Sequence, residues 1–374
     1  MTAPVVALLV VGGVLPPGAA VYRSRPAVVA SQNDLLADSC AAPDHCVAVG
    51  VYLSGAGEHT FAQTFNGHSW KIVSTPSPGR GAGLDAVSCP TLNWCLAVGG
   101  NNQGGVTEQL VGGSWRVLAS PKAAGHTTLT GVSCVTSKWC MAVGNDGPRQ
   151  NETLAELYHG HGWSVKPVAE PKGFGGSLVR AVSCASVSFC VMTGWYSGNG
   201  TPRGGRVLAE VFDGSSWTPT PLRLAGTQPW LNAISCPTAG ACVAIGSTNL
   251  SEPSPATVSE RYKSGTWTRI VEPRSLSGAH LGGIWCASAS SCVAVGAYRS
   301  GTGAERLSSA GWSEMRTPNP AGASPGLAGL SCRTSNSCVA VGQYTGGAAS
   351  EVSTLAEQMV AGRWSLLSTP DETL

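Results

Sequence analysis

The residues with the most evident chemistry are 14 cysteines, which form seven pairs with five residues between the two members. Structural zinc sites usually place two to four residues between paired thiolates, and no histidine recurs beside these pairs. None has the Cys-x-x-Cys spacing of a redox catalyst. We therefore predict seven structural disulfides, no metal site and no cofactor. The pairs are Cys40/Cys46, Cys89/Cys95, Cys134/Cys140, Cys184/Cys190, Cys236/Cys242, Cys286/Cys292 and Cys332/Cys338.

A framework of this kind indicates an exported protein, because cytosolic thiols are kept reduced. The apolar run 5–15 has the length of a signal-peptide core, and small residues follow it at positions 18–20. The run is too short for a comfortable transmembrane helix. We expect residues 1–25 to be a signal peptide or an N-terminal anchor, with no membrane span beyond such an anchor. Residues 26–374 are expected to form a single domain that is secreted or held at the cell surface.

The cysteine pairs belong to a repeat, whose period between successive first cysteines is 45 to 52 residues. This period is close to the length of one propeller blade. The chain of 374 residues has 49 glycines, 24 prolines and only 12% charged residues, which is typical of a turn-rich all-β protein. A glycine lies four residues after the second cysteine of every repeat, at Gly50, Gly99, Gly144, Gly194, Gly246, Gly296 and Gly342.

The sequence predicts four strands in each repeat. The first ends in Ser-Cys, except in the sixth repeat, where Trp285 replaces the serine. The second starts at the second cysteine and is short and apolar, as expected for a strand covered on both faces. A proline six residues after the blade tryptophan ends the fourth strand in five repeats, which suits an outer edge. The tryptophans are Trp70, Trp115, Trp163, Trp217, Trp267, Trp312 and Trp364, and the prolines are Pro76, Pro121, Pro273, Pro318 and Pro370.

We therefore predict an all-β fold, a seven-bladed β-propeller with four antiparallel strands and one hairpin disulfide per blade. A linear β-solenoid is the alternative. Solenoid ends usually degenerate into capping repeats, whereas the tryptophan recurs in all seven units of this chain. The repeat also runs in phase along the domain. Each blade is therefore expected to be whole, so ring closure by one shared blade is not required. The sequence leaves open whether residues 26–33 add a strand outside the seventh blade.

The third strand carries a carboxylate seven residues before the blade tryptophan in six repeats. A ring of chemically active sites is one interpretation. A structural role is favoured, because a buried carboxylate without hydrogen-bond partners is costly and a glutamine in the first repeat keeps the bonding capacity without the charge. We expect these side chains to form hydrogen bonds between neighbouring blades. They are Gln63, Glu108, Glu156, Glu210, Glu260, Glu305 and Glu357.

The turn between the third and fourth strands has a glycine three residues before the tryptophan in four repeats, at Gly67, Gly112, Gly160 and Gly214. This turn resembles the Asp-box, Asp-x-Gly-x-Thr-Trp, of sialidase-like and photosystem-assembly-factor-like propellers. Asp213 lies one place nearer to the tryptophan than the Asp-box aspartate, and the last three repeats shift or lose the glycine. The resemblance implies the propeller fold and says little about activity.

The loops after the second strand and before the first strand are expected to share one face of the ring and to vary most in length. Variable loops often carry the function of a rigid scaffold. Aromatic and arginine side chains in them suit a glycan or a polar peptide, although the tyrosines have an alternative role as caps on the blade core. The candidate ligand-binding residues are Tyr52, Trp195, Tyr196, Arg203, Arg206, Trp230, Tyr298, Arg299 and Tyr344.

The favoured function is a secreted or cell-surface binding module without catalysis, a monomer whose ligand is an extracellular glycan or protein. The net charge of +2 gives no electrostatic basis for binding nucleic acid. The alternative is a propeller-type glycan-active hydrolase or lyase of the sialidase-like kind. That alternative requires acids and an arginine pair that converge at one mouth of the central channel, and the sequence assigns no catalytic residues to those roles.

Overall fold

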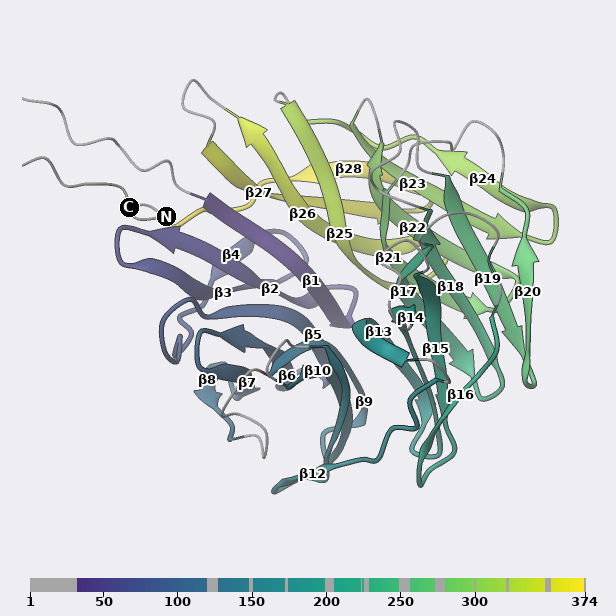
Figure 1. Cartoon of the computed structure of the whole chain (residues 1–374). Coiled ribbons are helices and arrows are strands. Elements are labelled where there is room, and N and C mark those ends of the chain that lie inside the picture. Colours follow the sequence, from purple (N-terminus) through teal and green to yellow (C-terminus); the bar gives the residue numbers. More distant parts are fainter. Residues whose placement is uncertain are drawn as a thin grey trace, which may run out of the picture.

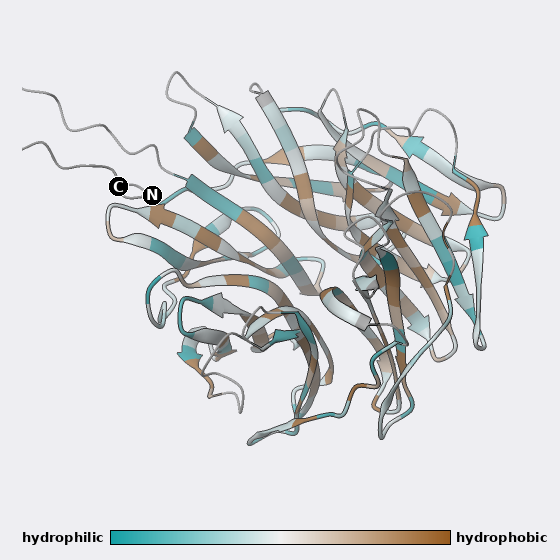
Figure 2. Cartoon of the chain, viewed as in Figure 1, coloured by the Kyte–Doolittle hydropathy of each residue, from teal (hydrophilic) through white to brown (hydrophobic). Residues whose placement is uncertain are grey.

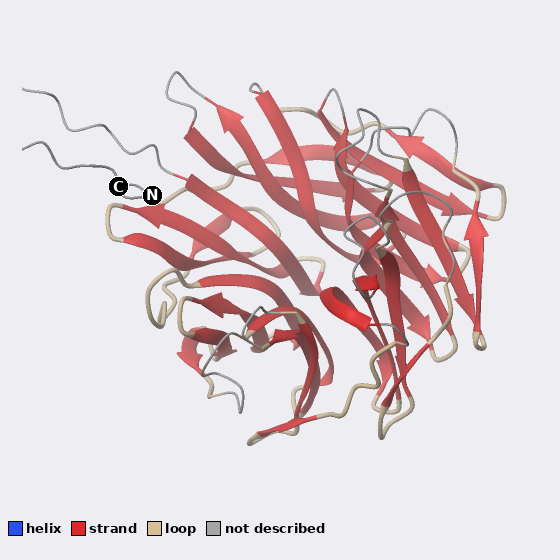
Figure 3. Cartoon of the chain, in the orientation of Figure 1, coloured by secondary structure: helices blue, strands red, loops and turns tan. Residues whose placement is uncertain are grey.

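The structure is a computed structural model that describes residues 32–119, 127–147, 151–171, 174–198, 205–222, 224, 229–248, 256–272, 280–298, 301–320, 323–346 and 351–372. Its regular elements are all β-strands, and no helix occurs among these residues (Figure 3). The strands form five four-stranded antiparallel sheets and one eight-stranded sheet. The larger sheet is two blades joined by one parallel pairing, between Gln32 and Val352. The described chain therefore forms the predicted seven blades.

Within each blade the strands follow one another from the first to the fourth in sequence order. The first strands are β1 (Gln32–Ala42), β5 (Gly83–Thr91), β9 (Thr128–Thr136), β13 (Phe174–Ser186), β17 (Trp230–Thr238), β21 (His280–Ser288) and β25 (Ala323–Thr334). The second strands are β2 (His45–Ser54), β6 (Trp94–Asn101), β10 (Trp139–Asp146), β14 (Phe189–Gly198), β18 (Ala241–Ser247), β22 (Ser291–Tyr298) and β26 (Ser337–Gly346). The third strands are β3 (Gly57–Phe65), β7 (Gly104–Val111), β11 (Glu152–Tyr158), β15 (Arg206–Phe212), β19 (Thr257–Lys263), β23 (Gly301–Ser308) and β27 (Glu351–Val360). The fourth strands are β4 (Trp70–Ile72), β8 (Ser114–Val117), β12 (Trp163–Val165), β16 (Trp217–Pro219), β20 (Thr266–Ile270), β24 (Gly311–Met315) and β28 (Arg363–Leu367).

The blades close into a ring (Figure 1). The first strands contact one another in the order β1, β5, β9, β13, β17, β21 and β25, and β25 returns to β1. A linear stack would leave β1 and β25 far apart, so the solenoid alternative is excluded. The first blade contains only residues 32–72 and the last only residues 323–367, so the ring closes without a shared blade.

The hydrophobic core lies between blades rather than in one central cluster. Each pair of neighbouring blades buries its own apolar set, as in the cluster that joins Met141 and Val143 of blade 3 to Met192, Phe212 and Trp217 of blade 4. Figure 2 shows hydrophobic residues along the inner strands. Burying a large apolar side chain contributes about 1.5–3 kcal/mol, so each blade interface stabilises the ring through its own apolar cluster.

A β-bulge occurs at the same place in the first strand of all seven blades. The pairing register skips the residue four positions before the first cysteine. The bulge places one backbone carbonyl, that of the residue two positions before the skipped one, against the repeat glycine. A Cβ added to that glycine would lie only 1.8–2.2 Å from the carbonyl oxygen. Glycine is therefore required in every blade. The skipped residues are Leu36, Asp85, Thr130, Arg180, Asn232, Gly282 and Ala328.

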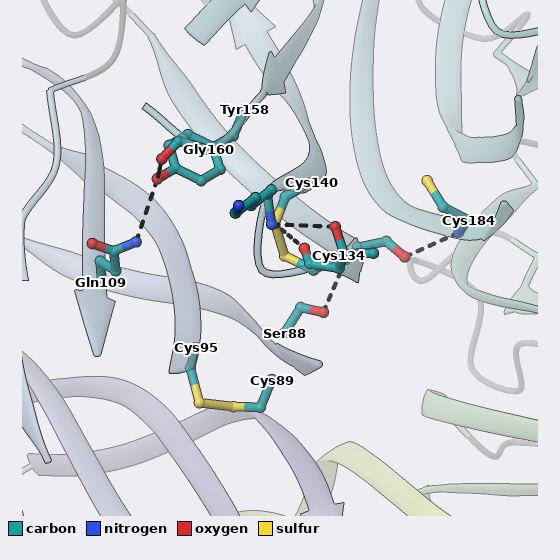
Figure 4. The surroundings of a disulfide bond; sticks show 12 residues. Ser88, Cys89, Cys95, Gln109, Cys134, Cys140, Tyr158, Gly160 and Cys184 are labelled. Atoms are coloured by element: carbon teal, nitrogen blue, oxygen red, sulfur yellow. Dashed lines mark hydrogen bonds between the residues drawn. A yellow bond between two sulfur atoms is a disulfide. The ribbon is translucent and has the colours of Figure 1, made fainter. Parts of the chain in front are cut away.

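The Ser-Cys dipeptide that ends the first strand links neighbouring blades. The backbone N–H of the cysteine donates to the serine Oγ of the preceding blade at 2.9–3.0 Å, as in the bonds of Cys134 to Ser88 and of Cys184 to Ser133 (Figure 4). Six such bonds surround the channel. Blade 6 has Trp285 instead of serine, and its side chain packs against the apolar cluster that includes Cys332 and Cys338 of blade 7. An apolar contact thus replaces the hydrogen bond at that interface.

All seven predicted disulfides are present, and no cysteine is free among the described residues. Each joins the first and second strands of one blade across the hairpin, with Cα atoms 3.9–4.1 Å apart. Closing a loop of this length lowers the conformational entropy of the unfolded chain, which raises the free energy of unfolding by about 2 kcal/mol. The bridges are Cys40–Cys46, Cys89–Cys95, Cys134–Cys140, Cys184–Cys190, Cys236–Cys242, Cys286–Cys292 and Cys332–Cys338.

The second cysteine of every bridge is buried, although the pattern of pairs alone did not distinguish it from the first. Its side chain enters the apolar cluster between neighbouring blades, as Cys190 does beside Met192 and Phe212. The second cysteines are therefore core residues, whereas the first cysteines Cys134 and Cys184 are half-buried. They are Cys46, Cys95, Cys140, Cys190, Cys242, Cys292 and Cys338, with exposed fractions of 0–3%.

The recurring third-strand carboxylates are buried, and the expected bonds between blades form at some of them. Glu108 accepts from Thr60 Oγ1 of the preceding blade at 3.1 Å, and Glu357 accepts from Thr302 Oγ1 at 2.8 Å. The expectation is wrong for Glu305, whose hydrogen-bond donor, Tyr298, belongs to its own blade.

Glu210 also departs from that expectation, because neither of its carboxylate oxygens has a hydrogen-bond partner among the described residues. The Thr153 hydroxyl of the preceding blade is directed instead to Glu170 and Ser177. Burial, with a smaller contribution from the negative charge of Glu170, raises the pKa of Glu210 to about 8. Burial likewise raises the pKa of Glu108 to about 7, although the Thr60 hydrogen bond opposes that rise.

The first prediction concerns the disulfides. Peptide mapping of the unreduced protein is expected to find the seven bridges within their hairpins. Replacing Cys236 and Cys242 together by serine is expected to lower the free energy of unfolding by about 2 kcal/mol, measured by urea denaturation. Free thiols throughout the purified protein would contradict the framework.

The second prediction concerns the repeat glycine. Gly144→Ala is expected to destabilise the fold by about 2 kcal/mol or more, because the new methyl group meets the Thr128 carbonyl oxygen at 2.0 Å. Gly55→Ala is the matched control, since nothing lies within 4 Å of the added Cβ there. Equal melting temperatures for the two variants would show that the bulge does not impose the glycine.

The third prediction concerns the unpartnered carboxyl group. The folded-state pKa of Glu210 is raised to about 8, so the native protein binds a proton that the unfolded chain releases above its ordinary pKa of about 4.3. The stability due to the neutral group is present at low pH and is lost as pH rises toward 8.

Glu210→Gln is therefore expected to stabilise the protein increasingly between about pH 5 and pH 8, with each pKa unit worth about 1.4 kcal/mol. Urea unfolding at pH 5 and pH 8.5 measures the difference. Glu108→Gln is the control and should gain less, because the folded-state pKa of Glu108 is about 7. A pH-independent gain for Glu210→Gln would disprove the assignment of a neutral buried acid.

Candidate functional site

The candidate site lies on one face of the ring, which we call the loop face. It carries the connections from second to third strands and the segments that lead from one blade to the next. The hairpins with the disulfides lie on the opposite face, because successive strands of a blade are antiparallel. The sequence-predicted ligand-binding residues with described positions all lie at this loop face. Arg203 and Arg299 lie outside the described residues.

Three of the predicted tyrosines pack onto their own blades, which matches the capping alternative. Tyr52 stacks on His59 with ring centroids 5.0 Å apart. The Tyr298 ring lies over Gly303, where an added Cβ would be 1.8 Å from the ring, and its hydroxyl donates to the buried Glu305. Tyr344 packs against the apolar cluster between blades 6 and 7. Their spread around the ring gives no shared binding surface.

Two predicted tryptophans from blades 4 and 5 come together. Trp195 at the end of β14 and Trp230 at the start of β17 stack with ring centroids 5.3 Å apart and planes 10° from parallel. The guanidinium of Arg180 lies 5.4 Å from the centre of the Trp230 ring, a cation–π contact. The Arg180 side chain is exposed, and both tryptophans are half-buried. We call these three residues the Trp–Arg stack.

Arg180 was not among the residues predicted from the sequence. It occupies the bulge of β13 and is the one cation among the seven bulge residues. Other bulge side chains reach the next blade: Thr130 Oγ1 donates to the Val179 carbonyl at 2.9 Å, and Asn232 Nδ2 to the Leu281 carbonyl at 3.2 Å. A comparison of bulge positions across the repeats would have singled out Arg180.

Asp85 and Arg180 are the two charged residues among the seven bulge positions. Burial raises the pKa of Asp85 to about 6, and the positive charge of Arg180 opposes the rise. The two residues belong to β5 and β13, two blades apart, so their attraction spans the inner side of the ring. A retaining glycosidase works with two carboxyl groups flanking the scissile bond. The described bulge positions supply one carboxyl group and one arginine.

A cavity of about 890 Å³ lies on the loop face at blade 4, and its lining includes Tyr196 and Pro229, the chain neighbours of Trp195 and Trp230. Tyr196 and Arg206, both predicted from the sequence, line it together with Glu170 of the preceding blade. Glu170 accepts hydrogen bonds from the backbone N–H and hydroxyl of Thr153, both at 3.1 Å. Four of the nine predicted residues, Trp195, Tyr196, Arg206 and Trp230, therefore meet in one sector.

Within the described stretches, no three histidine, cysteine, aspartate or glutamate side chains gather as a metal site would require. His159 and His161 lie edge to face with ring centroids 5.3 Å apart. None of the described segments forms a helix long and apolar enough to span a membrane.

No protein-family model and no curated protein sequence matches the chain. Solved structures with the same fold do match. YCF48 bound to D1 peptide has a TM-score of 0.58 at 12% identity, covering 88% of this chain and 94% of that chain. YCF48 from Cyanidioschyzon merolae has a TM-score of 0.57 at 12% identity, covering 88% and 96%. The GH74 xyloglucanase from Xanthomonas campestris has a TM-score of 0.51 at 14% identity, covering 91% and 61%. Identities this low establish the propeller fold alone.

Proposed function

We propose that the chain is a non-catalytic binding module that acts outside the cytoplasm and holds a protein ligand on the loop face of blades 4 and 5. The observation that carries this proposal is the meeting of the Trp–Arg stack with the adjoining cavity of about 890 Å³. Aromatic and arginine side chains are enriched where proteins bind one another.

The contacts that the Trp230 ring already makes favour a polypeptide over a glycan as the ligand. Both Trp195 and Arg180 already lie on this ring, which leaves little of its surface for a stacked sugar. The exposed Arg180 guanidinium retains N–H groups for carboxylate or carbonyl oxygens of a ligand. The solved structure of YCF48 with a bound peptide is a precedent for peptide binding on this fold.

The proposed location outside the cytoplasm is supported by the seven disulfides, which persist in oxidising compartments. The apolar run 5–15 supports export as well, as part of a signal peptide or anchor in residues 1–25. A monomer of one propeller domain is proposed, because the ring closes within a single chain.

The fourth prediction tests this function with peptide-display selection and a glycan array on the full chain. Selected peptides are expected to bind Trp230→Ala at least tenfold more weakly than the unaltered protein. His280→Ala is the matched control, because His280 occupies the same first-strand position in blade 6 and also packs its carbonyl against the repeat glycine. It should bind normally.

Three outcomes would count against the proposal. If binding of every selected peptide survives Trp230→Ala, the Trp–Arg stack is not the site. If only a glycan binds and its binding is lost in Trp230→Ala, the ligand is a sugar. If mass spectrometry finds that a bound ligand has been cleaved, the module is an enzyme and the hydrolase or lyase alternative is correct.

A further inference from the structure

The third strand of a blade is longer than the fourth and keeps an unpaired outer edge near the loop face. In blade 1, β4 pairs with only Gln63–Phe65 of β3, and in blade 4, β16 pairs with only Glu210–Phe212 of β15. Beyond the end of the fourth strand, every second residue of the third strand directs its N–H and C=O groups outward. Such an edge accepts another strand unless it is covered.

In blade 6 this edge is covered by the segment that leaves the fourth strand. Asn319 Oδ1 accepts from the Thr302 backbone N–H at 2.8 Å, and Thr317 Oγ1 donates to the Thr302 carbonyl at 2.9 Å. We call this Thr-Pro-x segment, at five to seven residues after the blade tryptophan, the edge clip. Blades 1 and 7 have equivalent clips, formed by Thr75 and Ser77 on Thr60 and by Thr369 and Asp371 on Thr354.

Among the described residues, blade 4 shows no edge clip. Leu222 and Leu224 stand at the clip positions, and a leucine side chain has no atom that can donate or accept. The strand residue that corresponds to Thr302 is Val207, since both pair with the residue that follows the repeat glycine. Among the described backbone hydrogen bonds outside the sheets, none reaches Val207. Blade 3 keeps part of its cover, because Glu170 caps the Thr153 N–H.

The uncovered edge lies in the cavity next to the Trp–Arg stack. Gly205, Val207 and Ala209 line this cavity. The Ala209 carbonyl accepts from the Thr220 N–H at 2.8 Å, on the side where β16 pairs. Because bonding direction alternates along a strand, the N–H and C=O of Val207 point to the same outer side. Within the described part of the chain, the cavity thus presents backbone groups of β15 that have no partner.

The two faces of this edge differ in chemistry. On the face toward blade 5, Val207 belongs to the apolar cluster against which Leu222 and Leu224 pack. On the face toward blade 3, Tyr196 lies beside the apolar cluster that includes Leu208, and the Arg206 side chain is exposed. Arg206 forms no ion pair within the described part of the chain. A strand added here would therefore place alternate side chains against an apolar wall and beside a free guanidinium group.

We propose that an extended peptide segment of a partner protein docks antiparallel to β15 as a fifth strand of blade 4, with apolar and acidic residues alternating. This inference rests on the proposed binding function and names its ligand class. Residues opposite Val207 share its hydrogen-bonding pair and its face. The apolar residues of the ligand therefore direct their backbone amides to β15, and the acidic residues direct their amides to solvent while their side chains meet Arg206.

The fifth prediction uses a labelled peptide of three Glu-Val repeats and the full chain, with binding measured by fluorescence anisotropy. The alternating peptide is expected to bind at least tenfold more tightly than its block isomer, three glutamates followed by three valines. N-methylation of the valine amides should abolish binding, whereas N-methylation of the glutamate amides should change it less than threefold. Arg206→Gln should weaken the alternating peptide about tenfold and leave a Ser-Val peptide unchanged.

The decisive variant supplies the missing edge clip. Leu222→Thr with Leu224→Asn places the hydroxyl and amide of the blade 6 clip at the same positions in blade 4, and is expected to abolish binding and to slow hydrogen exchange at the Val207 amide. Leu222→Ala with Leu224→Ala is the control, since it removes the apolar wall without capping the edge. It should weaken binding but leave that exchange rate unchanged.

Equal binding to the clipped variant and the unaltered protein, or equal effects of the two N-methylation patterns, would overturn the inference. The proposed function fails separately. If display-selected peptides bind through Trp230 but ignore the added clip, the binding module remains and only the added strand is wrong. If no peptide binds the unaltered protein, both are wrong.

Discussion

The contact on which the ring depends is the approach of a bulged first strand to the glycine beside it. In every blade the carbonyl two residues before the bulge occupies the space of a side chain on that glycine. The bulge in turn leaves one residue per blade on the inner side of the ring, from Leu36 and Ala328 to Asp85 and Arg180. The bulge thus provides seven positions at which the polarity of the side chain can differ without a change in the blade.

The interface that closes the ring differs from the other six in its hydrogen bonds. Gln63 stands where the other blades have glutamate because its partner is the Pro370 carbonyl, to which its Nε2 donates at 2.8 Å, and an ionised carboxylate cannot donate. Asn33 binds both backbone groups of Glu372, at 3.3 and 3.0 Å. Two side-chain amides therefore hold residues 370–372 against blade 1, and that of Asn33 acts as donor and acceptor at once.

The repeat was readable from the sequence because cysteine, glycine and tryptophan each meet a geometric demand that recurs in every blade. The sequence predicted both Trp195 and Trp230 as site residues, but not their contact, because it joins two blades. Arg180 could not be predicted before the position of the bulge was known. Tyr298 was assigned to the site, yet its hydroxyl is directed to the buried Glu305. Tyr298 lies over Gly303 and Trp195 over Gly205, so the glycine beneath a ring does not by itself separate a residue that caps its blade from one at the site.

A proline follows the blade tryptophan in five blades, where the chain leaves the outer strand. Blade 4 lacks this proline, and no edge clip covers its β15 edge among the described residues. Losing an edge clip exposes backbone groups that invite unwanted strand pairing, so the loss is tolerable only where another structure restricts access to the edge. The cavity in blade 4 meets this condition, with the β15 edge recessed between Leu222, Leu224 and the segment of Glu170. The same blade contributes Trp195 and Arg180 to the stack with Trp230. Two independent departures from the repeat therefore fall in one sector of the ring, which is the arrangement that selection for a ligand would produce and that stability alone would not.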